Sequence, residues 1–160
     1  MSGPDPPRTP ITPAGAAALQ AEIDELEGTR RREIAGRIRA ARELGDLKEN
    51  SEYHIAKNDQ AHLETRIKRL RTRLADAVVL DSSTDNETFS FGRTAEIIDE
   101  ASGHVHRFTL VGSTEADLAQ GRLSIESPIG TALMDRRVGE AVMIDTPRSA
   151  RRLRIKRLLD

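Results

Sequence analysis

A ladder of mostly apolar side chains, spaced three and four residues apart, runs through the middle of the chain and constrains its fold more than any other feature. Its members are Tyr53, Ala56, Gln60, Leu63, Ile67, Leu70, Leu74 and Ala77. A seam sustained over more than three heptads is typical of a helix that packs along a partner helix. Because the helix has only this one apolar stripe, we expect its other sides to be exposed.

A second helical segment precedes the first ladder and can supply its partner. From Pro13 to Glu43 no further proline occurs, and Thr12 and Pro13 suit the N-cap and first position of a helix. The apolar stripe of this segment is Leu19, Ile23, Leu26, Ile34, Ile38 and Ala41. The eleven residues from Ile23 to Ile34 are a stutter in the repeat. The two segments predict an antiparallel hairpin with arms of about 45 Å.

The remaining segments predict an α+β fold with a second domain after the hairpin. Residues 1–11 are proline-rich and predict a disordered leader, residues 12–80 the hairpin, and residues 81–87 a turn-rich linker. Residues 88–160 predict a small domain with an antiparallel sheet and one short helix at Pro128–Asp135. The expected strands are Thr94–Ile98, His106–Val111, Leu123–Ile125, Ala141–Ile144 and Leu153–Leu159.

The composition excludes several classes of protein. The chain has 160 residues and no cysteine, which excludes disulfide frameworks, thiolate zinc sites and cysteine nucleophiles. No run approaches the roughly 18 apolar residues that a membrane helix needs, and no signal peptide is visible, so we expect a cytoplasmic protein. The net charge of −1 argues against general coating of nucleic acid.

The connection between the two helices carries the candidate functional residues. Gly45 suits a left-handed turn after the first helix, and Asp46 and Glu49 follow at a spacing of three. In one interpretation they form a capping box for the second helix, although Asn50 or Ser51 could cap it instead. In the other they recruit a metal ion. Two carboxylates are too few for a dedicated Mg²⁺ cage but can share the ion with ligands from another molecule.

The residues around this connection resemble the hairpin tip of the GreA/GreB family of bacterial transcription elongation factors. The strongest match is the run Ala41–His54, with Gly-Asp-Leu-Lys-Glu-Asn at its centre. Further matching segments are Ile11-Thr12-Pro13 with Gly15, Ala77–Asp81, Leu110-Val111-Gly112 with Glu115-Ala116-Asp117, and Ser124–Ile129. The resemblance therefore covers nearly the whole chain after residue 11.

The resemblance implies an N-terminal antiparallel coiled coil and a C-terminal FKBP-like domain. Such factors bind the rim of the secondary channel of bacterial RNA polymerase and insert the coiled coil. Asp46 and Glu49 would then help to hold the second Mg²⁺ at the polymerase active centre, which cleaves backtracked RNA. This implies an accessory factor rather than an enzyme, and a monomer that binds no Mg²⁺ stably by itself. It also implies contact with the 3′ end of nascent RNA, and roles in transcription regulation and DNA binding.

Two further groups have both a functional and a local interpretation. Arg42, Lys48 and Lys57 flank the tip and could contact RNA phosphates, or could be solvated charges that pair with Glu43, Glu49 and Glu52. Ser127, Pro128 and Ile129 match the stretch with which the family docks on the polymerase. Their local interpretation is a serine N-cap followed by proline in the first turn.

Three rival hypotheses remain from the sequence. A channel-blocking inhibitor would bind the polymerase without promoting cleavage. A coiled-coil or FKBP-like adaptor would only bind a partner. A prolyl isomerase would need an aromatic pocket, for which the second half offers only Phe89, Phe91 and Phe108. The alternating basic C-terminus, Leu153-Arg154-Ile155-Lys156, predicts a charged edge strand or, less simply, a nucleic-acid contact.

Overall fold

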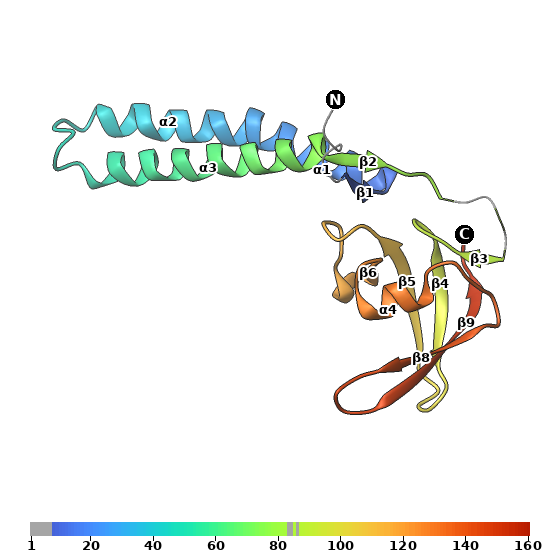
Figure 1. The fold of residues 1–160 in the computed structure, drawn as a ribbon. Coiled ribbons are helices and arrows are strands. Elements are labelled where there is room, and N and C mark those ends of the chain that lie inside the picture. Colours follow the sequence, from blue (N-terminus) through green and yellow to red (C-terminus); the bar gives the residue numbers. More distant parts are fainter. Residues whose placement is uncertain (1–7, 83–84, 86) are drawn as a thin grey trace, which may run out of the picture. The chain divides into compact units, whose positions relative to one another are not determined.

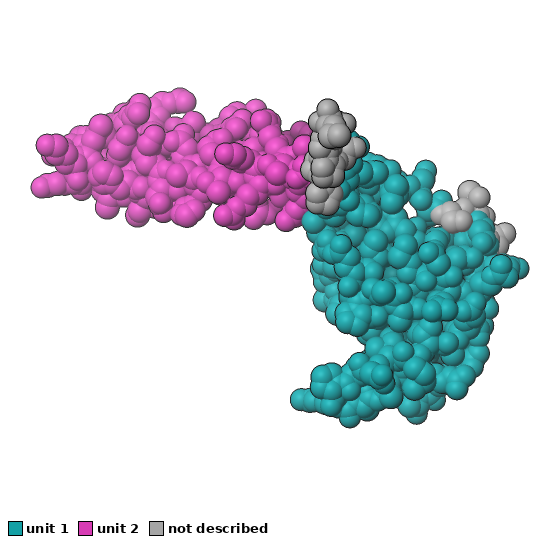
Figure 2. All heavy atoms as spheres, in the orientation of Figure 1, with its two compact units in different colours: residues 1–15, 77–160 teal, residues 16–76 magenta. Residues whose placement is uncertain are grey.

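The computed structural model describes residues 8–82, 85 and 87–160, and the chain divides into two compact units (Figures 1 and 2). One unit is residues 16–76, and the other combines residues 1–15 with residues 77–160. The unit of residues 16–76 is helical, and the other unit contains the sheet, which confirms the predicted α+β class. In the described part of the chain, no helix is both long and apolar enough to span a membrane.

The helical unit is the predicted antiparallel hairpin. One arm is built from α1 (Pro13–Glu25), the π-helical segment η1 (Leu26–Arg30) and α2 (Arg31–Arg42), and the other arm is α3 (Ser51–Ala75). Figure 1 shows α2 and α3 running side by side. The buried core between the arms is formed by Ile34, Ile38, Ala56, Leu63 and Ile67, with Leu26 and Tyr53 packed against it. These are seam positions, so the periodicity identified the buried faces.

The stutter in the first arm appears as a π-helical segment. Leu26 and Ile34 are eight residues apart, whereas two turns of a heptad repeat contain seven residues. The five residues of η1 absorb this extra residue, since a π-turn contains one residue more than an α-turn. Ile34 and Ile38 therefore still face α3 and are buried.

Ion pairs join the two arms along their exposed sides. The guanidinium of Arg31 lies 2.8 Å from the carboxylate of Glu64, and that of Arg37 lies 2.9 Å from Asp59. The hydrogen bonds from Arg31 hold the pKa of Glu64 below its ordinary value. Two further pairs join Arg66 to Glu22 and Arg71 to Glu27. Exposed pairs of this kind contribute little stability, so the apolar seam remains the main source of packing energy.

A short parallel ladder corrects the prediction of a disordered leader up to residue 11. Strand β1 (Thr9–Ile11) pairs with β2 (Ala77–Val79), while residues 1–7 lie outside the described part. Burial of Ile11, which is only 2% exposed, together with the ladder hydrogen bonds, orders this segment despite Pro10. The same pairing places Ala77 in a strand rather than at the end of the second helix. Linker residues 83, 84 and 86 also lie outside the described part.

The start of α1 is held by residues of the sheet unit. Thr12 caps the helix as predicted, because its hydroxyl accepts a hydrogen bond from the backbone N–H of Gly15 at 3.0 Å. The carboxylate of Glu115 accepts bonds from the Thr12 hydroxyl at 2.5 Å and from the N–H groups of Thr12 and Gly112 at 3.1 and 3.2 Å. A Cβ at position 15 would lie 1.9 Å from this carboxylate, which explains the glycine.

The main sheet has five strands in the order β6-β5-β4-β9-β8. Their bounds are β4 (Thr94–Asp99), β5 (Val105–Val111), β6 (Arg122–Ser124), β8 (Ala141–Asp145) and β9 (Ala150–Leu158). Each predicted strand is present, but the sheet is mixed rather than antiparallel because β5 and β6 run parallel. The connection between these two strands contains the 3₁₀ turn η2 (Leu118–Gln120), which returns the chain to the starting end of β5.

Smaller elements complete the domain. The pattern missed β3 (Thr88–Phe89) and β7 (Arg136–Arg137), which pair with each other and are too short to show an alternation. Helix α4 (Pro128–Leu133) occupies the predicted helical stretch. The core contains Phe89, Ala95, Ile97, Leu110, Leu123, Leu133, Ile144, Leu153 and Ile155.

The basic strand β9 is not the edge strand that the sequence predicted. It lies between β4 and β8, and its arginines pair with carboxylates. Arg157 forms two hydrogen bonds with Glu96, at 2.8 and 2.9 Å, and the guanidinium groups of Arg152 and Arg154 both approach Glu100. The positive charge of these three arginines is therefore balanced locally, and their positions give no independent argument for nucleic-acid binding.

Candidate functional site at the hairpin tip

The tip is an exposed loop between α2 and α3. The backbone N–H of Leu44 donates to the carbonyl of Ala41 at 3.1 Å, which closes the last turn of α2. Gly45 follows with φ of +117°, a backbone conformation that glycine adopts without steric cost. The predicted glycine turn is therefore present, and it directs residues 46–50 back toward the start of α3.

Asn50, and not Asp46, caps the second helix. The Asn50 side-chain oxygen accepts a hydrogen bond from the backbone N–H of Tyr53 at 3.1 Å. The capping-box interpretation of Asp46 and Glu49 is therefore wrong, and the alternative cap at Asn50 is correct. The reason is distance along the chain: Asp46 lies five residues before the first helical residue, whereas Asn50 directly precedes it.

The two carboxylates at the tip are exposed and only lightly engaged. Oδ1 of Asp46 accepts a hydrogen bond from the backbone N–H of Lys48 at 2.9 Å, which leaves its other oxygen unused. Glu49 forms no hydrogen bond or ion pair with any described residue. Both side chains can therefore bind a group from outside the chain without breaking a structural interaction, apart from one local turn.

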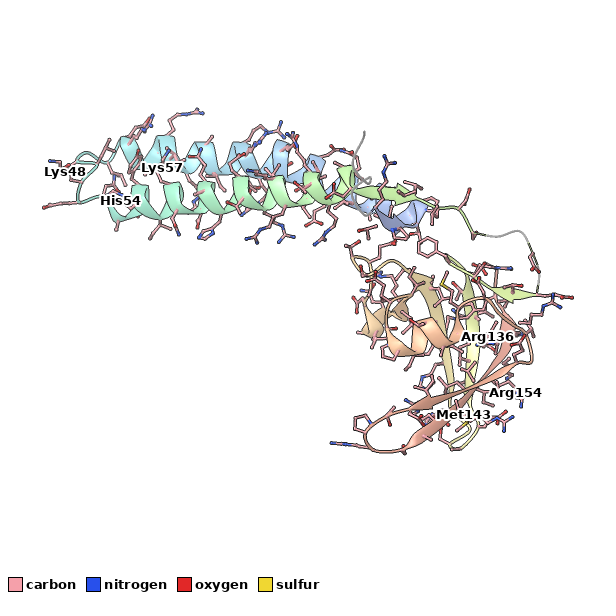
Figure 3. The ribbon with its side chains drawn as sticks, viewed as in Figure 1. Lys48, His54, Lys57, Arg136, Met143 and Arg154 are labelled. Atoms are coloured by element: carbon pink, nitrogen blue, oxygen red, sulfur yellow. The ribbon has the colours of Figure 1, made fainter. Side chains whose placement is uncertain are left out.

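The basic residues near the tip do not form the predicted pairs with Glu43, Glu49 and Glu52 among the described residues. The Arg42 guanidinium instead lies 5.9 Å from the centre of the Tyr53 ring, and Lys57 donates to Gln60 at 3.1 Å. Figure 3 shows Lys48, His54 and Lys57 toward the end of the hairpin where the chain turns. The side chains of Arg42, Lys48 and Lys57 therefore form no ion pair with the tip carboxylates among the described residues.

The donor set suits a shared hard cation better than a resident one. Within residues 8–82, 85 and 87–160, no three histidine, aspartate or glutamate side chains form a group that could hold a metal ion. Asp46 and Glu49 offer oxygen ligands of the kind that Mg²⁺ prefers, and Mg²⁺ often takes only one or two protein carboxylates. The tip fits the ion only if another molecule supplies the remaining ligands.

The structure also shows tip contacts that the sequence does not predict, including a second bond of the predicted alternative cap, Asn50. Leu44 and Leu47 are 68% and 42% exposed, so no apolar packing holds the loop. The Asn50 amide also donates from Nδ2 to the Ala41 carbonyl at 2.5 Å, and His54 Nε2 donates to the Lys48 carbonyl at 3.3 Å. The signal in the sequence is an amide directly before a helix, since asparagine carries an acceptor oxygen that can cap the helix and a separate NH₂ donor that can bond elsewhere.

The second predicted site, at Ser127, Pro128 and Ile129, has the local geometry of a helix start. The Ser127 hydroxyl accepts from the N–H of Gly130 at 3.0 Å, and Pro128 occupies the first turn of α4. Pro128 is exposed, whereas Ile129 is partly buried and packs against the sheet core. The capping interpretation is confirmed, and the exposed proline remains available for a contact.

The aromatic residues do not form the open pocket that an isomerase would need. Phe89 and Phe91 are buried, with exposures of 0% and 7%. Phe108 is stacked on His106, with ring centres 5.5 Å apart. His104 and His106 lie 6.4 Å apart between ring centres, without a third ligand among the described residues.

Comparison with known proteins gives the same result for both halves of the chain. Residues 9–79 match the family model described as the N-terminal part of a transcription elongation factor, GreA/GreB, and residues 84–159 match the model of its C-terminal part. The chain is 42% identical over 146 residues to the transcription elongation factor GreA of Roseiflexus sp. (strain RS-1), which covers 91% of this chain and 93% of that protein.

Other relatives agree with this match. The transcription elongation factor GreA of Geobacillus kaustophilus is 40% identical over 139 residues, covering 86% of this chain and 88% of that protein. Among solved structures, GreA factor homolog 1 of Thermus thermophilus is 28% identical and covers 96% of this chain and 99% of its own. Its TM-score is 0.42, a superposition too loose to support a structural comparison.

Proposed function

This chain belongs to the GreA/GreB family of transcription elongation factors, and on that premise we propose that it binds the secondary channel of bacterial RNA polymerase and stimulates cleavage of backtracked nascent RNA. The cleavage activity belongs to the polymerase. As a member of this family, the chain is an accessory factor rather than an enzyme. We expect the factor to rescue elongation complexes that have arrested.

One observation carries the proposal: the acidic pair at the tip is exposed and is not used to cap α3. Asp46 keeps one carboxylate oxygen unused, and Glu49 has no partner among the described residues. A capping role would have explained the pair without any function. Since Asn50 performs that role, the pair is free for a task outside the chain.

The task we propose is to complete a Mg²⁺ site within the polymerase. Asp46 and Glu49 would supply two oxygen ligands, and the polymerase the others. Such an ion lowers the pKa of a bound water and stabilises charge that develops on a phosphoryl group. The part played by this chain is to present two carboxylates at the end of the hairpin and to hold them in place. The isolated protein is proposed to hold no Mg²⁺ stably.

Other predicted residues have supporting roles in this proposal. Arg42, Lys48 and Lys57 would contact phosphates near the RNA 3′ end, which is supported by their lack of ion pairs with the tip carboxylates among the described residues. Ser127, Pro128 and Ile129 would dock on the polymerase through the exposed start of α4. We also keep as proposals the domain boundaries at residues 12–80 and 88–160, a monomeric state and a cytoplasmic location. The family match does not specifically support DNA binding.

The test is RNA cleavage in a halted, backtracked elongation complex with purified factor. We expect Asp46→Ala and Glu49→Ala each to lower the cleavage rate about 100-fold, because loss of a ligand to a catalytic ion costs several kcal/mol and each 1.4 kcal/mol is a factor of ten. Binding to the polymerase should be unchanged, since neither side chain belongs to the proposed docking surface.

Glu43→Ala and Glu52→Ala are the matched controls, because they remove the same charge from the same tip. We expect both to cleave at nearly the wild-type rate. Equal activity of the Asp46→Ala/Glu49→Ala double variant and the wild type would refute the proposal. A factor that only slows nucleotide addition, at every Mg²⁺ concentration, would instead be the channel-blocking inhibitor.

A further inference from the structure

The side-chain amide of Asn50 connects the two helices at the tip. Its Nδ2 donates to the carbonyl of Ala41 at 2.5 Å, and its Oδ1 accepts from the N–H of Tyr53 at 3.1 Å. The Ala41 carbonyl is in the last turn of α2 and already accepts from the N–H of Leu44, so Nδ2 of Asn50 is an additional donor to it. The N–H of Tyr53 is in the first turn of α3, where N–H groups lack partners within their own helix. One side chain therefore bonds to both helices, one at each end of the loop.

Only an amide can make both bonds at this position. An aspartate would cap α3 equally well, but it has no donor for the Ala41 carbonyl, and a serine is too short to span the two helices. The bond to Tyr53 belongs to helix capping, which any good N-cap residue provides. The bond to Ala41 is an additional contact that the cap does not require.

A second pair of hydrogen bonds holds the middle of the loop. Lys48 donates its N–H to Oδ1 of Asp46 at 2.9 Å and accepts at its carbonyl from Nε2 of His54 at 3.3 Å. The peptide groups of Lys48 thus link the Asp46 carboxylate to the first turns of α3. The position of this carboxylate depends on where the loop lies relative to α3.

Hydrogen bonds are the main restraint on the loop, because little packing supports it. Every residue from Arg42 to Glu49 is exposed, including Leu44 and Leu47. A loop without apolar contacts opens at low free-energy cost unless specific bonds hold it. Loss of the bridge from Asn50 to Ala41 would therefore free the end of the loop that carries both acidic residues.

We propose that Asn50 is a positioning residue for RNA cleavage, which tethers the tip loop to α2 and so holds Asp46 and Glu49 in the geometry that the shared ion needs. This inference rests on the proposed function. It predicts that the bridge affects the rate of the bound complex rather than its affinity, since Asn50 acts through the two carboxylates and not through the docking surface.

The first test measures the loop in the free protein. Asn50→Ser and Asn50→Asp both keep an oxygen that can cap α3. Neither can donate to the Ala41 carbonyl, because aspartate has no donor and the serine hydroxyl is too short to reach. We expect amide hydrogen exchange at Leu44 and Lys48 to become about ten-fold faster or more, with helical circular dichroism unchanged. Asn58→Ser is the matched control, because Asn58 is exposed on α3 and has no partner among the described residues. Unchanged exchange in both Asn50 variants would overturn the proposed tether.

The second test measures cleavage at saturating factor. We expect both Asn50 variants to lower the maximal cleavage rate about ten-fold, because displacement of a catalytic group by an ångström can cost up to 100-fold. The factor concentration for half-maximal rate should stay the same, and the Mg²⁺ concentration for half-maximal rate should rise several-fold. Asn58→Ser should match the wild type in all three measurements.

Different results would refute the proposed function and the role of Asn50. If Asp46→Ala and Glu49→Ala leave cleavage unchanged, the proposed function is wrong. If these two variants lose cleavage while both Asn50 variants keep the wild-type maximal rate, the proposed function stands and the role of Asn50 is refuted. A raised half-saturating factor concentration with an unchanged maximal rate would also refute the positioning role, because that result would mean that Asn50 contributes to docking on the polymerase.

Discussion

At the scale of single residues, the surroundings of two aspartates assign them opposite roles. Asp99, at the end of β4, is 5% exposed. Its Oδ2 accepts a hydrogen bond from Nε of Arg151 at 3.0 Å and forms an ion pair with Nη2 at 2.9 Å. Its Oδ1 accepts from the N–H of Ala101 at 3.0 Å. Asp46 is exposed and has a single backbone donor. Both oxygens of Asp99 are therefore used within the fold, whereas Asp46 can bind a group from another molecule.

The hydrogen bonds from Arg151 hold the pKa of Asp99 below its ordinary value, with smaller help from the N–H groups of Ala101 and Ser102. The ionised form thus stabilises the fold above the unfolded-state pKa of about 3.9, and this contribution is lost as the pH falls through the lower folded-state pKa. We expect Asp99→Asn to lower Tm at pH 7. The difference in Tm between this variant and the wild type should shrink below about pH 4. Thermal unfolding across pH 2–7 measures this.

Asp145→Asn is the control for this experiment, since Asp145 is an exposed aspartate of β8, in the same sheet, with no side-chain partner among the described residues. It should shift Tm little at any pH. A difference between Asp99→Asn and the wild type that stays constant from pH 7 to pH 2 would show that Asp99 acts through shape rather than charge.

At the scale of elements, the π-helical segment η1 reconciles an irregular repeat with a continuous seam. The first arm has one residue too many between Leu26 and Ile34, and the local widening of the helix absorbs it. The two isoleucines beyond it, Ile34 and Ile38, stay buried against α3 as a result. The irregularity is therefore confined to five residues, and the rest of the arm is ordinary α-helix.

Deletion of one residue in η1 tests this account. Removing Gly28 should convert the π-turn to an α-turn, keep Ile34 and Ile38 on the seam, and leave Tm equal to or above that of the wild type. Removing Gly36 should rotate Ile38 and Ala41 by about 100° relative to Ile34 and destabilise the hairpin by at least about 2–5 kcal/mol. Thermal unfolding followed by circular dichroism compares the two variants.

The two deletions are matched because both glycines are helical and a Cβ at either position would meet no atom within 4 Å. Neither glycine therefore has a packing role of its own. Equal losses of stability from the two deletions would mean that the extra residue does not reside in η1.

At the scale of the whole molecule, the chain contains two hydrophobic cores rather than one. The hairpin core is the seam around Ile34 and Ile67, and the sheet core surrounds Leu110 and Ile155. The sheet unit is discontinuous in sequence, because β1 comes before the hairpin and pairs with β2 after it. The hairpin is therefore an insertion that leaves and re-enters one small parallel ladder.

Separate cores predict separate responses to mutation. Ile67 is 2% exposed and Leu110 is 0% exposed. Ile67→Ala and Leu110→Ala each remove most of a buried aliphatic side chain and should lower the free energy of unfolding by about 2–5 kcal/mol. We expect Ile67→Ala to speed hydrogen exchange mainly in α2 and α3, and Leu110→Ala mainly in the five-stranded sheet. Equal acceleration in both units by either variant would show that the chain unfolds as one cooperative unit.

Features that depend on local chemistry and periodicity could be predicted from the amino-acid sequence. The seam predicted both arms and their buried faces, Thr12 and Pro13 predicted the start of α1, and Gly45 predicted the turn at the tip. These features are readable because helix packing, capping and positive φ each impose a residue type at a fixed spacing. The acidic pair at Asp46 and Glu49 was also visible as a candidate site, although not its freedom from capping.

Features that depend on residues far apart in the chain could not be predicted from the sequence and are seen in the folded protein. Pairing of β1 with β2 ordered residues 9–11, the parallel addition of β6 made the sheet mixed, and pairing on both sides placed β9 in its interior. At the tip, the contact from Asn50 to Ala41 spans nine residues and joins the end of the loop to α2. Such pairings follow from which backbone groups meet in space, and no single stretch of sequence specifies both partners.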